Sequence, residues 1–362
     1  MSIRPAEPLL PLTSGRWPLA GLSVLGTQND TTYYDTNAAS VLNDTRMTGT
    51  AFWSVNPYTG CAFGCAYCYA RYAHRYVMER AVTAHALPSE SAAAIADLPP
   101  WLAFERHIVV KRNAPTVLAR TLRQGGPRHL ALLKGEMILI GTATDPYQPA
   151  ERRYRVTRGI LEVLATHPGL HIGIITKSPL ITRDADLLAR IARRSSLSVN
   201  VSLITVDRAL ARRLEPRAPT PESRLRAIAR LREAGVDAGL NIMPVLPGIT
   251  DDPAMLDALV RAAAGAGAAR IGVCALRLQH EARKRYLPFI AEEFPHLAHR
   301  YEAAYARGPN VSERYREGLS RYVHALGRKY GVRVGHRAED EEAEPEAPVP
   351  PPDPQLAFEF TA

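Results

Sequence analysis

Cysteine is scarce in this chain, and the sequence also lacks the apolar runs that membrane proteins need. Four cysteines in 362 residues exclude the disulfide scaffold of a small secreted domain. No uninterrupted apolar stretch is long enough to span a bilayer. The N-terminus "MSIRPAEPLLPLTSGRW" shows no charged segment followed by a clean apolar one, so no signal peptide is expected. These absences predict a cytoplasmic protein without a membrane partner.

Basic residues are absent from the last 25 positions, and this absence makes the rest of the chain strongly basic. Residues 338–362 carry eight of the 36 acidic side chains and no Lys or Arg. The remainder has 45 basic against 28 acidic residues, a net charge of +17, compared with +9 for the whole chain. Such a body suits a polyanionic partner such as DNA or RNA. An arginine-rich surface typical of an Ala- and Arg-rich proteome explains the charge equally well.

Apolar strand-like runs alternate with helical patterns from residue 51 to residue 278, and we count six such strands. The helical patterns include residues 65–81, 149–169 and 178–194. Right-handed crossovers between parallel strands predict an α/β fold, a partial (β/α)6 TIM-like barrel. A doubly wound sheet is the alternative, although no G-x-G-x-x-G pattern follows the first strand to support dinucleotide binding. No repeat of solenoid period is present.

Composition divides the chain into four segments. Residues 1–50 are predicted to be an irregular N-terminal extension, and residues 51–280 the barrel, with an insert at about 80–131 that holds one strand and one helix. Residues 281–337 form a basic helical C-terminal segment. Residues 338–362 are an acidic, Pro-rich linker that ends in a short apolar peptide.

Three of the four cysteines stand together as C-x3-C-x2-C at Cys61, Cys65 and Cys68, in a loop just after the first predicted strand. Thiolates this close repel one another unless they share a cation, so a metal or cluster is expected. A structural zinc site takes four ligands, and Cys274 lies in an apolar strand where a packed core thiol is expected. Three ligands on one loop favour a [4Fe–4S] cluster with one open iron, and a three-cysteine zinc knuckle is the alternative.

The string "NPYTGCAFGCAYCYAR" resembles the radical S-adenosylmethionine (SAM) superfamily, and Tyr67 fills the aromatic position beside the adenine. The stretches "VVKRNAP", "GTATDPYQPAE", "ITKS" and "GLNIMPVLPGITD" are similar to the spore photoproduct lyase-like, or DNA repair photolyase-like, subgroup over roughly residues 50–290. The resemblance implies that the three cysteines hold the cluster and that SAM occupies its fourth iron.

The resemblance also implies SAM contacts at the ends of later strands. Thr144 takes the position of the element that holds the methionyl amine, although "TDP" also fits a turn and helix cap. Lys177 is implied to bind the SAM carboxylate, although a loop lysine is commonly only solvated.

Ser202, with Asn200 on the same strand face, is implied to approach the ribose or sulfonium, and Met243, with Pro244, to line the adenine site. Alternatively, Ser202 and Asn200 only fill the barrel interior with polar side chains, and Met243 and Pro244 only pack in the core. Glu215 and Arg224 lie near the fourth loop, where either can be a surface group in a salt bridge, and neither is assigned to the site.

An enzyme of this kind receives an electron from a flavodoxin- or ferredoxin-like donor and cleaves SAM to methionine and a 5′-deoxyadenosyl radical. Spore photoproduct lyase places a further cysteine just before the Thr/Ser-Asp of the second-strand element. Thr142 or Ala143 stands there in this chain, which argues against thymine-dimer reversal.

The chain ends in "DPQLAFEFTA", an apolar peptide on an acidic tether. Gln355, Leu356, Phe358 and Phe360 resemble the peptide by which bacterial replication and repair proteins bind the polymerase sliding clamp. A tail that folds back onto the body is the alternative. The first hypothesis is therefore a radical SAM enzyme that repairs or modifies nucleic acid. The alternatives are a radical SAM enzyme on a protein or metabolite, and a non-catalytic Fe–S protein that binds nucleic acid.

Overall fold

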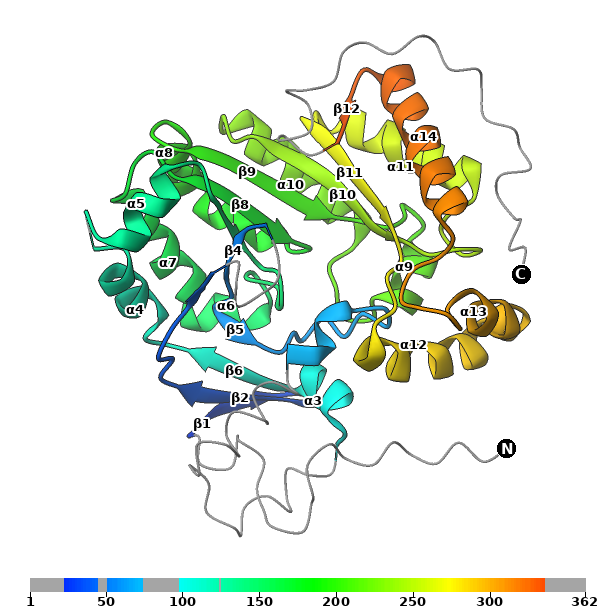
Figure 1. Ribbon diagram of the computed structural model, residues 1–362, viewed down its shortest axis with the longest axis horizontal. Helices are drawn as coiled ribbons and strands as arrows, with labels where there is room; N and C mark the ends of the chain where they lie inside the picture. Colours follow the sequence, from blue (N-terminus) through cyan, green and yellow to red (C-terminus); the bar gives the residue numbers. More distant parts are fainter. Residues whose placement is uncertain (1–22, 45–50, 74–97, 124, 336–362) are drawn as a thin grey trace.

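The computed structural model describes residues 23–44, 51–73, 98–123 and 125–335. Its larger sheet has eight strands in the order β12-β11-β10-β9-β8-β7-β4-β3 (Figure 1). The strands are β3 (Leu42–Asn43), β4 (Trp53–Val55), β7 (Met137–Ile140), β8 (His171–Thr176), β9 (Ser196–Ser202), β10 (Ala238–Val245), β11 (Arg270–Ala275) and β12 (Arg333–Val334).

The six strands predicted from the sequence, β4 and β7 to β11, lie side by side in chain order and run parallel. β12 adds a further parallel strand, and β3 pairs antiparallel at the other edge. Chain order without a reversal excludes the doubly wound alternative. Within the described residues β3 and β12 do not pair, so the mixed α/β fold has an open parallel sheet rather than a closed barrel.

Helices cover one face of this sheet because its strands alternate apolar and polar side chains. Ile174, Val201, Leu240 and Ile271 are fully buried in one apolar core with residues of the covering helices. These helices are α4 (Ala114–Thr121), α7 (Val156–Ala165), α8 (Ala185–Ala192), α10 (Pro221–Glu233), α11 (Pro253–Gly265) and α14 (Glu313–Tyr330). The opposite side, here called the polar face, carries Asn200, Ser202, Asn241, Met243 and Cys274.

A second apolar cluster lies at the carboxyl ends of the strands. Phe63 and Tyr67 pack there with Tyr286 and Phe289 of α12, separately from the core beneath the sheet. The helices of this end are α3 (Pro100–Arg106), α9 (Arg208–Leu214), α12 (His280–Glu293) and α13 (Ala298–Ala304), with a 3₁₀ turn η4 (Pro295–Leu297). The predicted helical C-terminal segment is thus present as α12, α13 and α14, divided by short breaks.

The N-terminal region corrects one prediction. Residues 23–44 are not irregular, because they contain β1 (Val24–Gln28) and β2 (Thr31–Thr36). These strands form a four-stranded sheet of order β1-β2-β6-β5 with β6 (His107–Lys111) and β5 (Tyr58–Thr59). The insert strand predicted around residue 108 is therefore present as β6. Because β5 leads directly into the cysteines, this small sheet positions the start of their loop.

Several helices also differ from their predictions. The helix expected from Pro149 is two helices, α6 (Pro149–Tyr154) and α7, because Arg155 adopts a left-handed φ of 50°. The helix expected after Ser178 begins as a 3₁₀ turn, η3 (Pro179–Asp184), and α9 is an element that sequence patterns missed. From Cys65 to Cys68 the chain is a loop, and a 3₁₀ turn, η2, starts only at Tyr69. The insert also contains α5 (Pro127–Leu133).

Some predictions fall outside the described residues. These include the acidic linker at 338–362 and the proposed clamp-binding residues Gln355, Leu356, Phe358 and Phe360. In the part of the chain that is described, no helix has the length and apolar character needed to cross a membrane.

Candidate metal and SAM site

The loop that carries the three cysteines is held in place from several distant segments. The backbone N–H of Cys61 donates to the carbonyl of Phe104 at 2.9 Å, and that of Ala66 donates to Leu214 at 3.0 Å. Gly64 has a φ of +64°, and a Cβ there would lie 2.7 Å from the Arg217 guanidinium. Glycine at this position therefore lets Arg217 cross close over the loop.

A buried ion pair between Arg71 and Glu105 supports the cysteine loop. Arg71 is fully buried and donates through Nη2 to the carbonyl oxygen of Cys65 at 2.7 Å and to Glu105 Oε2 at 2.7 Å. Its Nη1 donates to the carbonyl of Trp101. Neither charged residue was identified from the sequence, because nothing local indicates that these side chains, 34 positions apart, are buried together.

The three thiols are free, and their environment favours the neutral form until a cation is present. Burial and then the nearby Asp145 raise the pKa of Cys61 to about 12. Burial also raises the pKa of Cys65 well above its ordinary value, with Glu215 adding to the effect, and that of Cys68. Cys61 and Cys68 each raise the pKa of Cys65, so the three sulfurs lie within electrostatic range of one another. A bound metal would reverse this balance by stabilising the thiolates.

The donor set fits an iron–sulfur cluster. Three cysteines converge on one loop, and sulfur ligands are those that iron–sulfur clusters use. Among the described residues, no three His, Cys, Asp or Glu side chains lie close enough together to hold a single metal ion. A cluster does not need such an arrangement, because each cysteine ligates a different iron.

A second buried charge cluster lies beside the loop. Glu215 accepts hydrogen bonds from the Tyr67 hydroxyl and from Arg224, and its Oε1 lies 3.7 Å from Lys177 Nζ. The Lys177 ammonium also lies 5.6 Å from the centre of the Tyr67 ring. The side chains of Glu215 and Arg224 are fully buried, which excludes the surface salt bridge considered from the sequence.

The charges in this cluster stabilise one another. Burial disfavours the carboxylate of Glu215, but Arg224 and Lys177 lower its pKa below the ordinary value. Burial likewise disfavours the ammonium of Lys177, but Cys65 and Glu215 raise its pKa above the ordinary value. Lys177 therefore remains a cation beside the cysteine loop, 17% exposed and able to meet an anionic group.

The loop after β7 joins the cysteine loop to β8. Thr144 is buried, and its hydroxyl donates to the carbonyl of Gly60 at 2.5 Å and accepts from Gln148 Nε2 at 3.0 Å. The Asp145 carboxylate accepts from Thr176 Oγ1 and from the backbone N–H of Lys177, both at 2.7 Å. The "TDP" stretch is therefore a bracing turn. The N-cap position of the next helix is Gln148, not Asp145, and its side chain makes no capping hydrogen bond.

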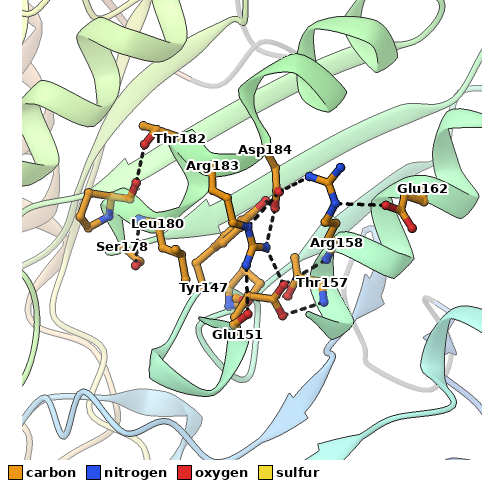
Figure 2. A network of polar contacts seen from close by, with 12 residues as sticks. Tyr147, Glu151, Thr157, Arg158, Glu162, Ser178, Leu180, Thr182, Arg183 and Asp184 are labelled. Carbon is orange, nitrogen blue, oxygen red and sulfur yellow. Dashed lines mark hydrogen bonds and ion pairs between the residues drawn. The ribbon is translucent and has the colours of Figure 1, made fainter. Parts of the chain in front are cut away.

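A network of ion pairs connects the helices that follow this loop to the segment after β8 (Figure 2). Glu151 is fully buried and accepts from Arg183 Nη2 at 2.9 Å. Asp184 accepts from Arg158 at 2.6 Å, from Arg183 at 2.7 Å and from the Tyr147 hydroxyl at 3.2 Å. Burial raises the pKa of Asp184, but the two guanidinium groups bring it below its ordinary value. The loop after β7 is thus fixed to the segment after β8.

The polar face contains the remaining predicted residues. Ser202 is buried, Asn200 and Met243 are half-buried, and all three face the same side of the sheet. Cys274 is not the packed core thiol expected from its apolar strand, because its side chain is exposed on this face. The surrounding protein still raises its pKa to about 11. Asn241, which sequence reasoning missed, lies between Ser202 and Gly272 on the neighbouring strands.

Comparison with known proteins matches residues 55–259 to the Radical SAM superfamily. Uncharacterized protein Rv2578c of Mycobacterium tuberculosis is 37% identical over 292 residues, which cover 81% of this chain and 78% of the relative. Uncharacterized protein MJ0683 of Methanocaldococcus jannaschii is 28% identical over 214 residues, 59% of this chain and 68% of the relative.

Among solved structures, a spore photoproduct lyase variant with dinucleoside spore photoproduct superposes with a TM-score of 0.56 at 11% identity, covering 86% of each chain. This likeness extends the shared fold well beyond the cysteine loop. The match over residues 55–259, and the close mycobacterial relative, show that the chain belongs to the radical SAM superfamily of enzymes.

Proposed function

We propose that Cys61, Cys65 and Cys68 hold a [4Fe–4S] cluster and that the chain cleaves SAM reductively to act on nucleic acid. The observation that carries the first part is the convergence of three free cysteines on one loop at the carboxyl ends of parallel strands. When bound, the cluster supplies an electron to SAM and so generates a 5′-deoxyadenosyl radical, which abstracts a hydrogen atom from the substrate. A flavodoxin- or ferredoxin-like protein is the proposed electron donor.

The residues beside the loop have distinct proposed roles toward SAM. Lys177 binds the carboxylate, supported by the charge that Glu215 maintains on it at 3.7 Å. The Tyr67 hydroxyl donates to Glu215, and this hydrogen bond keeps the ring against the Lys177 ammonium. In this position the ring contacts the adenine. Thr144 keeps its proposed place near the methionyl amine, with its hydroxyl also bracing Gly60. Ser202 and Met243 contribute from the polar face to the ribose and adenine.

A nucleic-acid substrate is supported by charge and by the neighbouring fold. Outside residues 338–362 the chain has 45 basic and 28 acidic side chains. The spore photoproduct lyase structure of similar fold holds a dinucleoside. Together these observations favour DNA or RNA over a protein or metabolite. Docking on a sliding clamp through the terminal peptide remains part of this proposal.

Anaerobic reconstitution tests the chemistry. The wild-type protein, given iron, sulfide, dithionite and SAM, is expected to form 5′-deoxyadenosine, and Cys65→Ala is expected to form none. Cys274→Ser is the matched control for iron binding, because its thiol lies on the polar face rather than in the loop, and it should bind the wild-type amount of iron. Equal 5′-deoxyadenosine production by wild type and Cys65→Ala would overturn the cluster assignment.

Salt-dependent binding tests the substrate class. Affinity for single- or double-stranded oligonucleotides is expected to fall steeply as salt rises, because phosphate contacts release counterions. If the protein binds no oligonucleotide, or binds with an affinity that does not change with salt, the result would favour a protein or metabolite substrate over nucleic acid.

A further inference from the structure

Asn241 has a buried oxygen that accepts no hydrogen bond. The side chain is 4% exposed, and within the described residues no donor reaches its Oδ1. Leaving such a group unsatisfied costs on the order of 1–3 kcal/mol, so an unsatisfied acceptor next to a reaction site indicates a ligand that donates to it. The polar side chains of Thr144, Asp145 and Glu215 differ in this respect, since each forms a hydrogen bond within the protein.

Asn241 lies on the polar face of the sheet, buried beside an opening to solvent. In the sheet register it lies between Ser202 of β9 and Gly272 of β11, two of the smallest residues, so neither neighbour covers it from the side. Farther along the same face toward the carboxyl ends, Met243 is half-buried and Cys274 is exposed. The face therefore opens to solvent immediately beyond Asn241, on the side where the cysteine loop lies.

Tyr69 supplies an aromatic surface at this opening. It follows the proposed cluster ligand Cys68, it is 49% exposed, and its hydroxyl donates to the carbonyl of Thr142, two residues after β7. That hydrogen bond fixes the ring while leaving part of it uncovered. Cys274 lies within electrostatic range of the Tyr69 phenol, and it follows by two residues Gly272, the register partner of Asn241. The exposed thiol therefore has Tyr69 within range and Asn241 on the adjacent strand.

We propose that Asn241 and Tyr69 form a subsite for a nucleobase of the substrate. An N–H on the edge of the base donates to Asn241 Oδ1, and the face of the base lies on the Tyr69 ring. Side-chain amides read base edges in this way, and aromatic rings stack on single-stranded bases. The inference rests on the proposed nucleic-acid substrate and assigns the residues that position the reacting nucleotide near Cys68.

The test measures binding of a labelled single-stranded oligonucleotide to the reconstituted, SAM-bound protein by fluorescence anisotropy. Asn241→Ala is expected to weaken binding about tenfold, the loss of one hydrogen bond in a buried site. Asn241→Asp, which retains an acceptor oxygen, is expected to lose less. Ser198→Ala, on the same face toward the amino end of β9, is the matched control and should bind as the wild type does.

An abasic oligonucleotide of the same length separates base recognition from backbone binding. With this ligand, wild type and Asn241→Ala should bind equally. Tyr69→Leu should weaken binding to the normal oligonucleotide by roughly tenfold or more, whereas Tyr69→Phe keeps the ring and should retain affinity. Iron content is measured in each Tyr69 variant, because the residue adjoins Cys68.

SAM affinity, measured by equilibrium dialysis on the same variants, distinguishes the two sources of a nucleobase. If Asn241→Ala weakens SAM binding and leaves oligonucleotide binding unchanged, the acceptor serves the adenine of SAM and the inference is wrong. Unchanged binding of both ligands would also overturn it. If the wild type itself binds no oligonucleotide, the proposed substrate class fails, and that result is distinct from a wild type that binds but is insensitive to Asn241.

Discussion

The Nη2 atom of Arg71 lies 2.7 Å from the carbonyl oxygen of Cys65, and the same nitrogen pairs with Glu105. The guanidinium thus connects the backbone of the central cysteine to α3. Since both charged side chains are almost fully buried, the loop depends on a pair whose members are each costly to leave alone.

Replacing Arg71 with Ala should therefore destabilise the protein strongly. The change removes the 2.7 Å ion pair of the buried Glu105 carboxylate and leaves it with the more distant Arg217, whose Nη2 lies 4.0 Å from Oε1. Breaking a buried pair in this way costs about 3–5 kcal/mol. Unfolding in urea measures the loss. Arg112→Ala is the matched control, because that side chain is 59% exposed in its pair with Asp35, and it should change the unfolding free energy by less than about 0.5 kcal/mol. Similar losses in the two variants would contradict the structural role of Arg71.

Lys177→Met should weaken SAM binding without removing the iron. A hydrogen bond to a charged group contributes about 1.5–3 kcal/mol, so the dissociation constant should rise about tenfold or more. Equilibrium dialysis with the reconstituted protein checks this, with iron content measured in parallel. Lys134→Met, at an exposed position, should bind SAM normally. Wild-type affinity in Lys177→Met would remove the lysine from the SAM site.

Cys274 should react with iodoacetamide only as the pH becomes alkaline. Its side chain is exposed, but its pKa is raised to about 11, and the thiolate is the reactive form. The rate should increase about tenfold per pH unit from neutral pH to about pH 10. Mass spectrometry of the tryptic peptide Ile271–Arg277 follows the reaction. A rate that levels off below about pH 9 would show an ordinary thiol pKa instead.

Asp251 should make stability depend on pH in the acid range. Its carboxylate accepts from the Tyr315 hydroxyl at 2.8 Å and from the N–H of Gly248 at 2.7 Å, yet burial raises its pKa from 3.8 to about 6. The folded state therefore binds the proton more tightly than the unfolded state does. The resulting stabilisation is complete below pH 3.8 and is lost as the pH rises through about 6.

Asp251→Asn should remove this dependence. The variant and the wild type are compared by urea unfolding at several pH values, and the difference between them should grow by about 3 kcal/mol in favour of the variant from acid to neutral pH. A constant difference would mean that Asp251 titrates normally in the folded protein.

The sequence was sufficient to predict the six parallel strands in order and the placement of the cysteines after the first of them, because apolar runs and cysteine spacing are local signals. It was insufficient for the burial of Glu215 and Arg224, because their charges are paired with each other and Glu215 also pairs with Lys177, which is distant in the chain. Strands β1 and β2 were missed because they are polar and only partly buried.

The prediction that Cys274 is a packed core thiol was wrong for a different reason, because the sequence did contain the signal for its exposure. In "RIGVCAL" the alternation places Cys274 with Gly272, opposite Ile271, so strand periodicity alone argues against a core thiol. Asn241 gave no such signal, because an unsatisfied oxygen is recognisable only when all surrounding donors are known.

The two separate apolar clusters imply two regions of different local stability. The core between the sheet and its helices contains none of the cysteines, whereas the cluster at the carboxyl ends includes Cys61 and Cys65 with Tyr286 of α12. Loss of iron should therefore loosen the second region while the first stays folded. Amide hydrogen exchange in the iron-free protein is expected to be fast across the cysteine loop and α12 and slow in β8 to β10. Cofactor loading would then be the last step of folding at one end of an already formed sheet.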